Sequence, residues 1–110
     1  MRQVRHPLVA RDLDELVDHI VSVTRGDIAA AARRLDQIDE LLEDIATNPS
    51  SGVRLADDLS GWLVRHGGKG RRLTIVFRAD LDLDILYIAV IAFGGRDWFA
   101  DADDRKEFGR

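Results

Sequence analysis

Two stretches in the first half of the chain carry apolar residues at helical spacing. The first has its apolar positions at Val9, Leu13, Leu16, Val17, Ile20 and Val21. The second has them at Ile28, Ala31, Leu35, Ile38, Leu42 and Ile45. Spacings of three and four predict amphipathic helices, and the second seam is too short to favour a coiled coil. Gly26 interrupts the pattern, and Asp27 can accept a backbone N–H of the next turn, so the sequence predicts a helical hairpin.

The second half of the chain changes to the period of strands. Pro49 ends the second helix, because the residue before a proline avoids the α region. Strands are expected at residues 62–65, 73–77 and 85–93, with a short first strand at 3–5. Short links between the last three favour an antiparallel meander, and the strand at 85–93 is apolar on both faces, so both should be covered.

These elements predict an α+β fold in which an N-terminal helical hairpin packs on a small antiparallel sheet. The length of 110 residues suits one modest core, so residues 1–110 are expected to form a single domain. Residues 100–110 are polar and are expected to form a frayed tail.

Composition narrows the classes of function. The chain has no cysteine, which excludes disulfides and thiolate metal sites and fits a cytoplasmic protein. The longest apolar run, from Ile85 to Phe93, is about half of what a membrane-spanning helix needs. The histidines His6 and His19 lack ligand-like neighbours in sequence, so we expect no metal and no cofactor.

The formal net charge of -4 argues against an indiscriminate nucleic-acid binder, but the charge is unevenly distributed. Residues 11–44 contain ten acidic residues and four arginines. Residues 59–79 contain no acidic residue and five basic ones, which are Arg65, Lys69, Arg71, Arg72 and Arg78. The helices are thus acidic and the sheet is basic. Each charged face is either simply exposed to solvent or part of a binding surface.

Several short motifs occur in an order that resembles a known family. The first helix contains Ala10-Arg11-Asp12-Leu13, the link after the second contains Pro49-Ser50-Ser51-Gly52, and Leu59-Ser60-Gly61 leads into a strand. The strand at 73–78 and the closing segment Phe93-Gly94-Gly95-Arg96-Asp97-Trp98 complete the pattern. Over residues 8–99 the chain resembles the RelE/ParE superfamily of toxin–antitoxin toxins.

This resemblance implies a toxin of a type II system that is neutralised in a hetero-oligomer with a cognate antitoxin. Among relatives, ParE-like members inhibit DNA gyrase without being nucleases, whereas RelE-like members cleave mRNA in the ribosome. The ParE-like function is the prediction, and a ribosome-dependent mRNA interferase or a degenerate, non-toxic interaction module are the alternatives.

The nuclease alternative lacks expected residues. RNA cleavage without a metal needs a proton acceptor, a cation for the phosphorane and a proton donor. Thr74 aligns with the strand arginine of nuclease relatives. The C-terminal tyrosine, or histidine–tyrosine pair, that many of them use is absent, and the nearby Trp98 and Phe99 cannot transfer protons. Arg96 and Arg72 are the catalytic candidates if the protein is a nuclease, with Arg72 requiring a bulged strand or a shifted alignment. For a binding toxin, we expect the target-facing residues to be Arg65, Arg71, Arg78, Arg96 and Trp98.

The remaining candidates have simpler interpretations. His66 can titrate near neutral pH, but no carboxylate adjoins it in sequence, so a solvated strand end is expected. Gly67-Gly68-Lys69-Gly70 lacks the spacing of a P-loop and suits a hairpin turn. Trp62 is expected in the core. An exposed apolar groove between the helices and the sheet is expected to receive the antitoxin.

Overall fold

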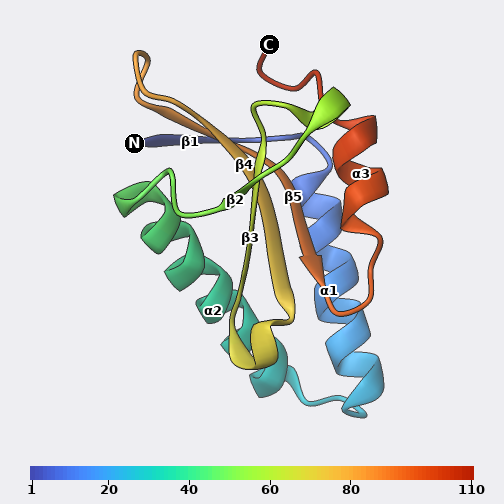
Figure 1. The fold of residues 1–110 in the computed structure, drawn as a ribbon. Coiled ribbons are helices and arrows are strands. Elements are labelled where there is room, and N and C mark those ends of the chain that lie inside the picture. The colour runs from blue at the N-terminus through green and yellow to red at the C-terminus, as the bar shows by residue number, and fades with distance from the viewer.

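The predicted helical hairpin packs on a five-stranded sheet in the computed structural model of residues 1–110 (Figure 1). In chain order the elements are β1 Arg2–Arg5, α1 Val9–Val23, α2 Ile28–Thr47, β2 Val53–Arg54, the 3₁₀ turn η1 Asp57–Leu59, β3 Leu63–Gly67, the 3₁₀ turn η2 Lys69–Arg71, β4 Leu73–Asp80, β5 Ile85–Phe93 and α3 Trp98–Asp104. The predicted α+β class is therefore confirmed. None of the helices combines the length and apolar composition needed to cross a membrane.

The strand order of the sheet is β1-β5-β4-β3-β2. Strands β3 to β5 form the expected antiparallel meander, with Val64 opposite Val76 and Val76 opposite Val90, and the short β2, which was not predicted, extends it. The short first strand pairs parallel to β5, which makes the sheet mixed instead of purely antiparallel. A parallel pair needs a long connection, and the helical hairpin between β1 and the meander supplies it.

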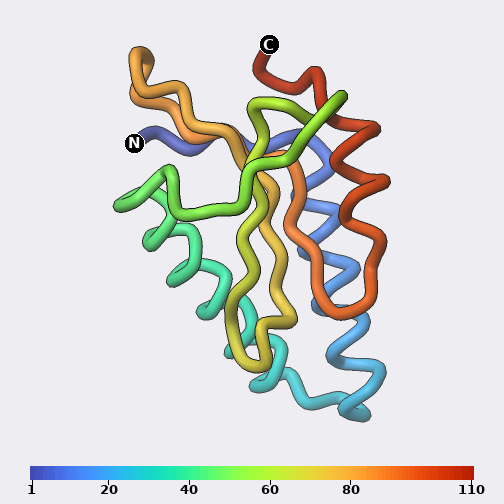
Figure 2. The backbone as a smooth tube through the Cα atoms, viewed as in Figure 1, coloured from blue at the N-terminus to red at the C-terminus, as the bar shows by residue number.

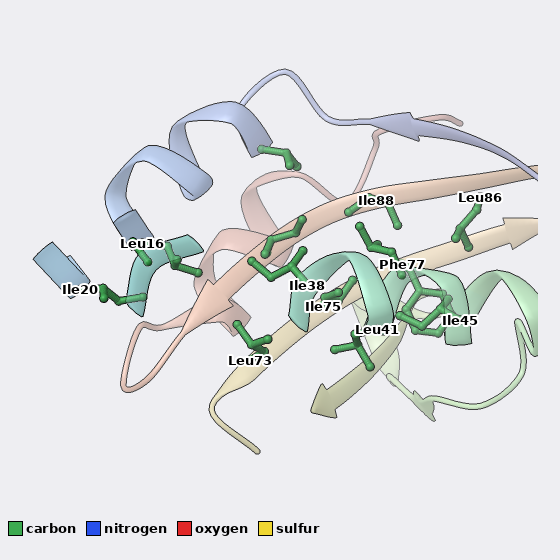
Figure 3. Packing of buried hydrophobic residues seen from close by; sticks show 14 residues of the cluster. Leu16, Ile20, Ile38, Leu41, Ile45, Leu73, Ile75, Phe77, Leu86 and Ile88 are labelled. Atoms are coloured by element: carbon green, nitrogen blue, oxygen red, sulfur yellow. The ribbon is translucent and has the colours of Figure 1, made fainter. Parts of the chain in front are cut away.

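Each face of the sheet has its own core. On one face, α1 and α2 bury Leu16, Ile38 and Ile45 against Ile75 and Phe77 of β4 (Figure 3). On the other, Trp62, Val76, Val90 and Ala102 form a smaller cluster under η1 and α3. Strand β5 contributes to both cores, as its continuous apolar sequence predicted, and Trp62 is buried as expected.

The C-terminal segment is folded, which corrects the prediction of a frayed tail over residues 100–110. Asp97 caps α3 by accepting from the backbone N–H of Ala100. Beyond the helix the chain continues to the C-terminus at the top of the view (Figure 2), and the indole Nε1 of Trp62 donates to the Lys106 carbonyl at 3.0 Å. Arg105 is 6% exposed despite its charge. The polar sequence of this segment suggested fraying. The sequence did not reveal that Arg105 is buried, because its partner lies far away along the chain.

Candidate functional site

The Asp12 carboxylate is the centre of a buried ionic cluster. It lies in the first turn of α1 with a side chain that is 0% exposed. Its Oδ2 accepts from Arg105 Nη1 at 2.7 Å and from the Ile91 backbone N–H at 3.1 Å. Its Oδ1 accepts from Arg96 Nη2 at 2.8 Å and Arg105 Nη2 at 3.0 Å. Hydrogen bonds from both arginines offset the cost of burying this charge.

The cluster also provides hydrogen-bond partners for the backbone of β5 beyond the point where the neighbouring strand β1 ends. Strand β1 pairs with β5 only as far as Ile88, leaving the backbone beyond it without a strand on that side. There, Asp12 accepts the Ile91 N–H, and Arg105 Nη1 donates to the Ala89 carbonyl at 2.9 Å. The aspartate of the Ala-x-Asp-Leu motif therefore links α1, β5 and the C-terminal segment.

Arg96 is held by three carboxylates. Its guanidinium lies 2.7 Å from Asp101, 2.8 Å from Asp12 and 3.0 Å from Glu15. Burial alone would lower the pKa of Arg96, but the hydrogen bond to Asp101 and the charges of Asp12, Asp101 and Glu15 raise it above its ordinary value. The side chain, 23% exposed, therefore anchors the loop after β5 to α1 and α3.

Arg72 and Arg96, the two catalytic candidates, line the same cavity of about 380 Å³. Glu15 and His19 of α1 and the Phe93–Gly95 segment line it too. Arg72 follows η2 in a helical backbone conformation, so it does not replace Thr74 on the strand. It lies over Phe93 and lines a cavity with residues of α1, and the strand has no bulge next to it, so the condition under which Arg72 could take the Thr74 position is not met.

The ring of Phe93 contacts two arginines that come from different elements. Arg34 of α2 and Arg72 each place their guanidinium carbon 5.0 Å from the ring centroid, a cation–π geometry. Arg34 also donates to Gln37 Oε1 at 2.8 Å and to the Lys69 carbonyl at 3.4 Å. Arg34 and Phe93 were not among the sequence candidates, because only the fold brings α2 next to the end of β5.

Thr74 occupies the strand position where nuclease relatives carry an arginine. It is 5% exposed, and its hydroxyl lies 2.8 Å from His66 Nδ1 on the neighbouring strand. The His66 ring meets Trp98 edge-on, with the ring centroids 5.9 Å apart. His66 is thus half-buried between Thr74 and Trp98, which corrects the expectation of a solvated strand end.

The five expected target-facing residues do not form one surface. Arg65 on β3 pairs with Asp44 of α2 at 3.7 Å, while Arg71 is exposed in η2. Arg78 lies over the rings of Trp62 and Tyr87 and donates to the Gly109 carbonyl at 2.6 Å, so it holds the C-terminal segment. Trp98 is half-buried against the smaller core.

The glycine of the Pro49–Gly52 motif is required by packing. A Cβ at Gly52 would meet the Val64 carbonyl oxygen at 2.9 Å and the Phe77 ring at 3.0 Å. Any larger residue would push the link between α2 and β2 away from the sheet.

Comparison with known families agrees with this geometry. Residues 4–98 match the family described as "ParE toxin of type II toxin-antitoxin system, parDE". No curated protein matches the chain significantly. The match covers helices α1 and α2, strands β2 to β5, the second half of β1 and the motif residues Asp12, Gly52 and Arg96. The chain therefore belongs to the ParE toxin family of type II toxin–antitoxin systems.

Proposed function

We propose that the protein arrests growth by binding and poisoning DNA gyrase, without cleaving RNA. The observation that supports this most strongly is Thr74, whose buried hydroxyl bonds to His66 where nuclease relatives carry an arginine. A threonine cannot neutralise the charge of a phosphorane. Arg96, the other candidate cation, already has three carboxylate partners.

The target-facing surface then centres on the exposed Arg71 in η2, and Arg65 on the preceding strand β3 contributes to it. Arg96 and Arg78 bind groups within the chain, so we assign them to positioning the C-terminal segment. Trp98 supports α3, which places the exposed Phe99, 55% accessible, at the surface next to it.

We expect the antitoxin to bind between the helices and the sheet. Most of that interface is filled by the chain's own core. A cavity of about 500 Å³ remains where α1, α2 and β5 meet, with Ile20, Val23, Ala30 and Phe93 as its apolar lining. An apolar side chain from an extended or helical antitoxin tail fits this cavity.

Inducible expression in bacteria tests the target. The protein alone should stop growth, and co-expression of an antitoxin from the neighbouring reading frame should restore it. Purified protein should inhibit supercoiling by gyrase and increase cleaved DNA, while mRNA from arrested cells stays intact. Arrest with cleaved mRNA and unaffected supercoiling would overturn the proposal, and normal growth would favour a degenerate interaction module.

The mRNA interferase remains the second candidate because Arg72 and Arg96 share a cavity with His19. In that case both cations would act on RNA supplied by the ribosome. Arg96→Ala would then abolish cleavage on translating ribosomes, whereas Glu15→Gln, a change to a carboxylate of the same cavity, would retain most of it.

A further inference from the structure

We propose that one end of the molecule, which we term the basic end, binds the phosphate backbone of double-stranded DNA. The basic end consists of Arg34, Lys69, Arg71 and Arg72. The inference rests on the proposed function for its biological setting, since gyrase acts on DNA. It adds a second partner to that function, namely the DNA that the enzyme holds.

Contacts within the structure show that these cations lie together. Arg34 donates to the Lys69 carbonyl, and Arg34 and Arg72 share the ring of Phe93. Lys69 and Arg71 belong to η2, which lies beside the first half of α2 at one end of the molecule (Figure 1). Lys69, Arg71 and Arg72 are exposed.

The charges of the basic end are not neutralised by the protein. None of its side chains lies within ion-pairing distance of a carboxylate. The acidic groups that share a cavity with Arg72 are Asp12 and Glu15, and both are paired with arginines. Glu40 and Asp44 line a cavity with Lys69 without pairing to it. The positive field of the basic end is therefore available to an external anion.

The arrangement suits phosphates better than bases or an apolar peptide. Phe93 already carries two guanidinium groups, so its ring is not free for a base to stack on. The exposed members are flexible cations in a tight turn, without an apolar anchor among them. Contacts of this kind go to the backbone and carry no sequence preference. The net charge of -4 weakens binding to free DNA, so the contact should be strongest at low salt.

A charge-matched pair of variants tests the basic end on DNA alone. The probe is a fluorescein-labelled duplex of mixed sequence, followed by anisotropy from low to physiological salt. Lys69→Gln/Arg72→Gln should weaken binding about tenfold or more and make the salt slope shallower by roughly 2, because two phosphate contacts are lost. Arg2→Gln/Arg5→Gln removes the same charge from β1 and should change neither. No binding at low salt, or equal loss in both variants, would overturn the proposal.

A second arm separates this inference from the gyrase proposal. Affinity for gyrase is measured with and without a bound DNA segment. The wild type should bind the DNA-loaded enzyme more tightly, and Lys69→Gln/Arg72→Gln should lose that difference while keeping its affinity for DNA-free gyrase. If affinity for DNA-free gyrase falls as well, Lys69 and Arg72 contact gyrase itself, as proposed for the neighbouring Arg71, and the inference is wrong. If the wild type binds DNA but not gyrase, the proposed function fails while the DNA contact stands.

Discussion

At the scale of single residues, Asp12 carries the largest expected effect on stability. Asp12→Asn keeps the shape of the side chain and removes its charge, leaving the Arg105 guanidinium buried without a carboxylate partner. Loss of one partner of a buried ion pair costs about 3–5 kcal/mol. We expect a decrease of that size in the free energy of unfolding, measured by urea denaturation.

Glu15→Gln is the matched control for this measurement. Glu15 also pairs with Arg96, but its side chain is 46% exposed, and exposed pairs contribute less than about 1 kcal/mol. If Asp12→Asn costs no more than Glu15→Gln, the buried cluster does not stabilise the fold in the way described.

The free energy of unfolding should depend on pH because of His6. Its Nδ1 accepts from the Leu8 backbone N–H at 3.0 Å at the start of α1, so the neutral ring is required. Burial, followed by the charge of Arg105, lowers the pKa of His6 below 6.5, and Asp12 only partly opposes this. The unfolded chain therefore binds more protons than the folded one as the pH falls through 6.5. The free energy of unfolding should decrease between pH 7.5 and 5.5.

His6→Asn isolates this contribution. An asparagine oxygen can accept the same backbone N–H and does not titrate. The variant should show a shallower decrease in the free energy of unfolding over the same pH range. An unchanged slope would mean that His6 does not cause the pH dependence.

At the scale of elements, Gly52 sets how closely the α2–β2 link approaches the sheet. Gly52→Ala introduces a Cβ 2.9 Å from the Val64 carbonyl oxygen. Overpacking of this kind costs about 1–3 kcal/mol, which thermal unfolding should detect as a lower Tm. Gly95→Ala is the control because its Cβ would meet nothing within 4 Å. Equal Tm values for the two variants would contradict the packing role of Gly52.

The regular elements were predictable because their patterns are local. The seams of α1 and α2, the cap at Asp27 and the apolar run of β5 each lie within one segment of sequence. The parallel pairing of β1 and the folding of α3 were not predictable in this way. Both depend on groups that meet only after the sheet forms, and Arg105 and Asp12 are separated by 93 positions.

At the scale of the whole molecule, the same limit applies to the candidate site. The sequence identified Arg72 and Arg96, and the fold does bring them to one cavity. It could not show that Arg96 would meet Asp12 across 84 positions, or that Arg34 of α2 would share Phe93 with Arg72. A sequence shows which residues are charged. Only the folded chain shows which of these charges lack a partner.

The C-terminal segment lies outside the family match yet closes the second core, so we expect the whole molecule to depend on it. Deletion of residues 99–110 removes Ala102 from the core under α3, the carbonyl bonded to Trp62 and the guanidinium of Arg105. The free energy of unfolding should fall by at least about 3 kcal/mol, the cost of leaving Asp12 without this partner. A lower urea midpoint and binding of a hydrophobic dye would report the change.

Phe99→Ser is the matched control for this deletion, since that side chain is 55% exposed and surface substitutions change stability little. It should unfold at the wild-type urea concentration and bind no dye. A truncated chain that also unfolds at the wild-type midpoint would mean that residues 1–98 are stable by themselves and do not need the C-terminal segment. A large loss would mean that the sheet needs both of its covered faces, and that this chain reaches its stability only with a C-terminal segment that lies outside the family match.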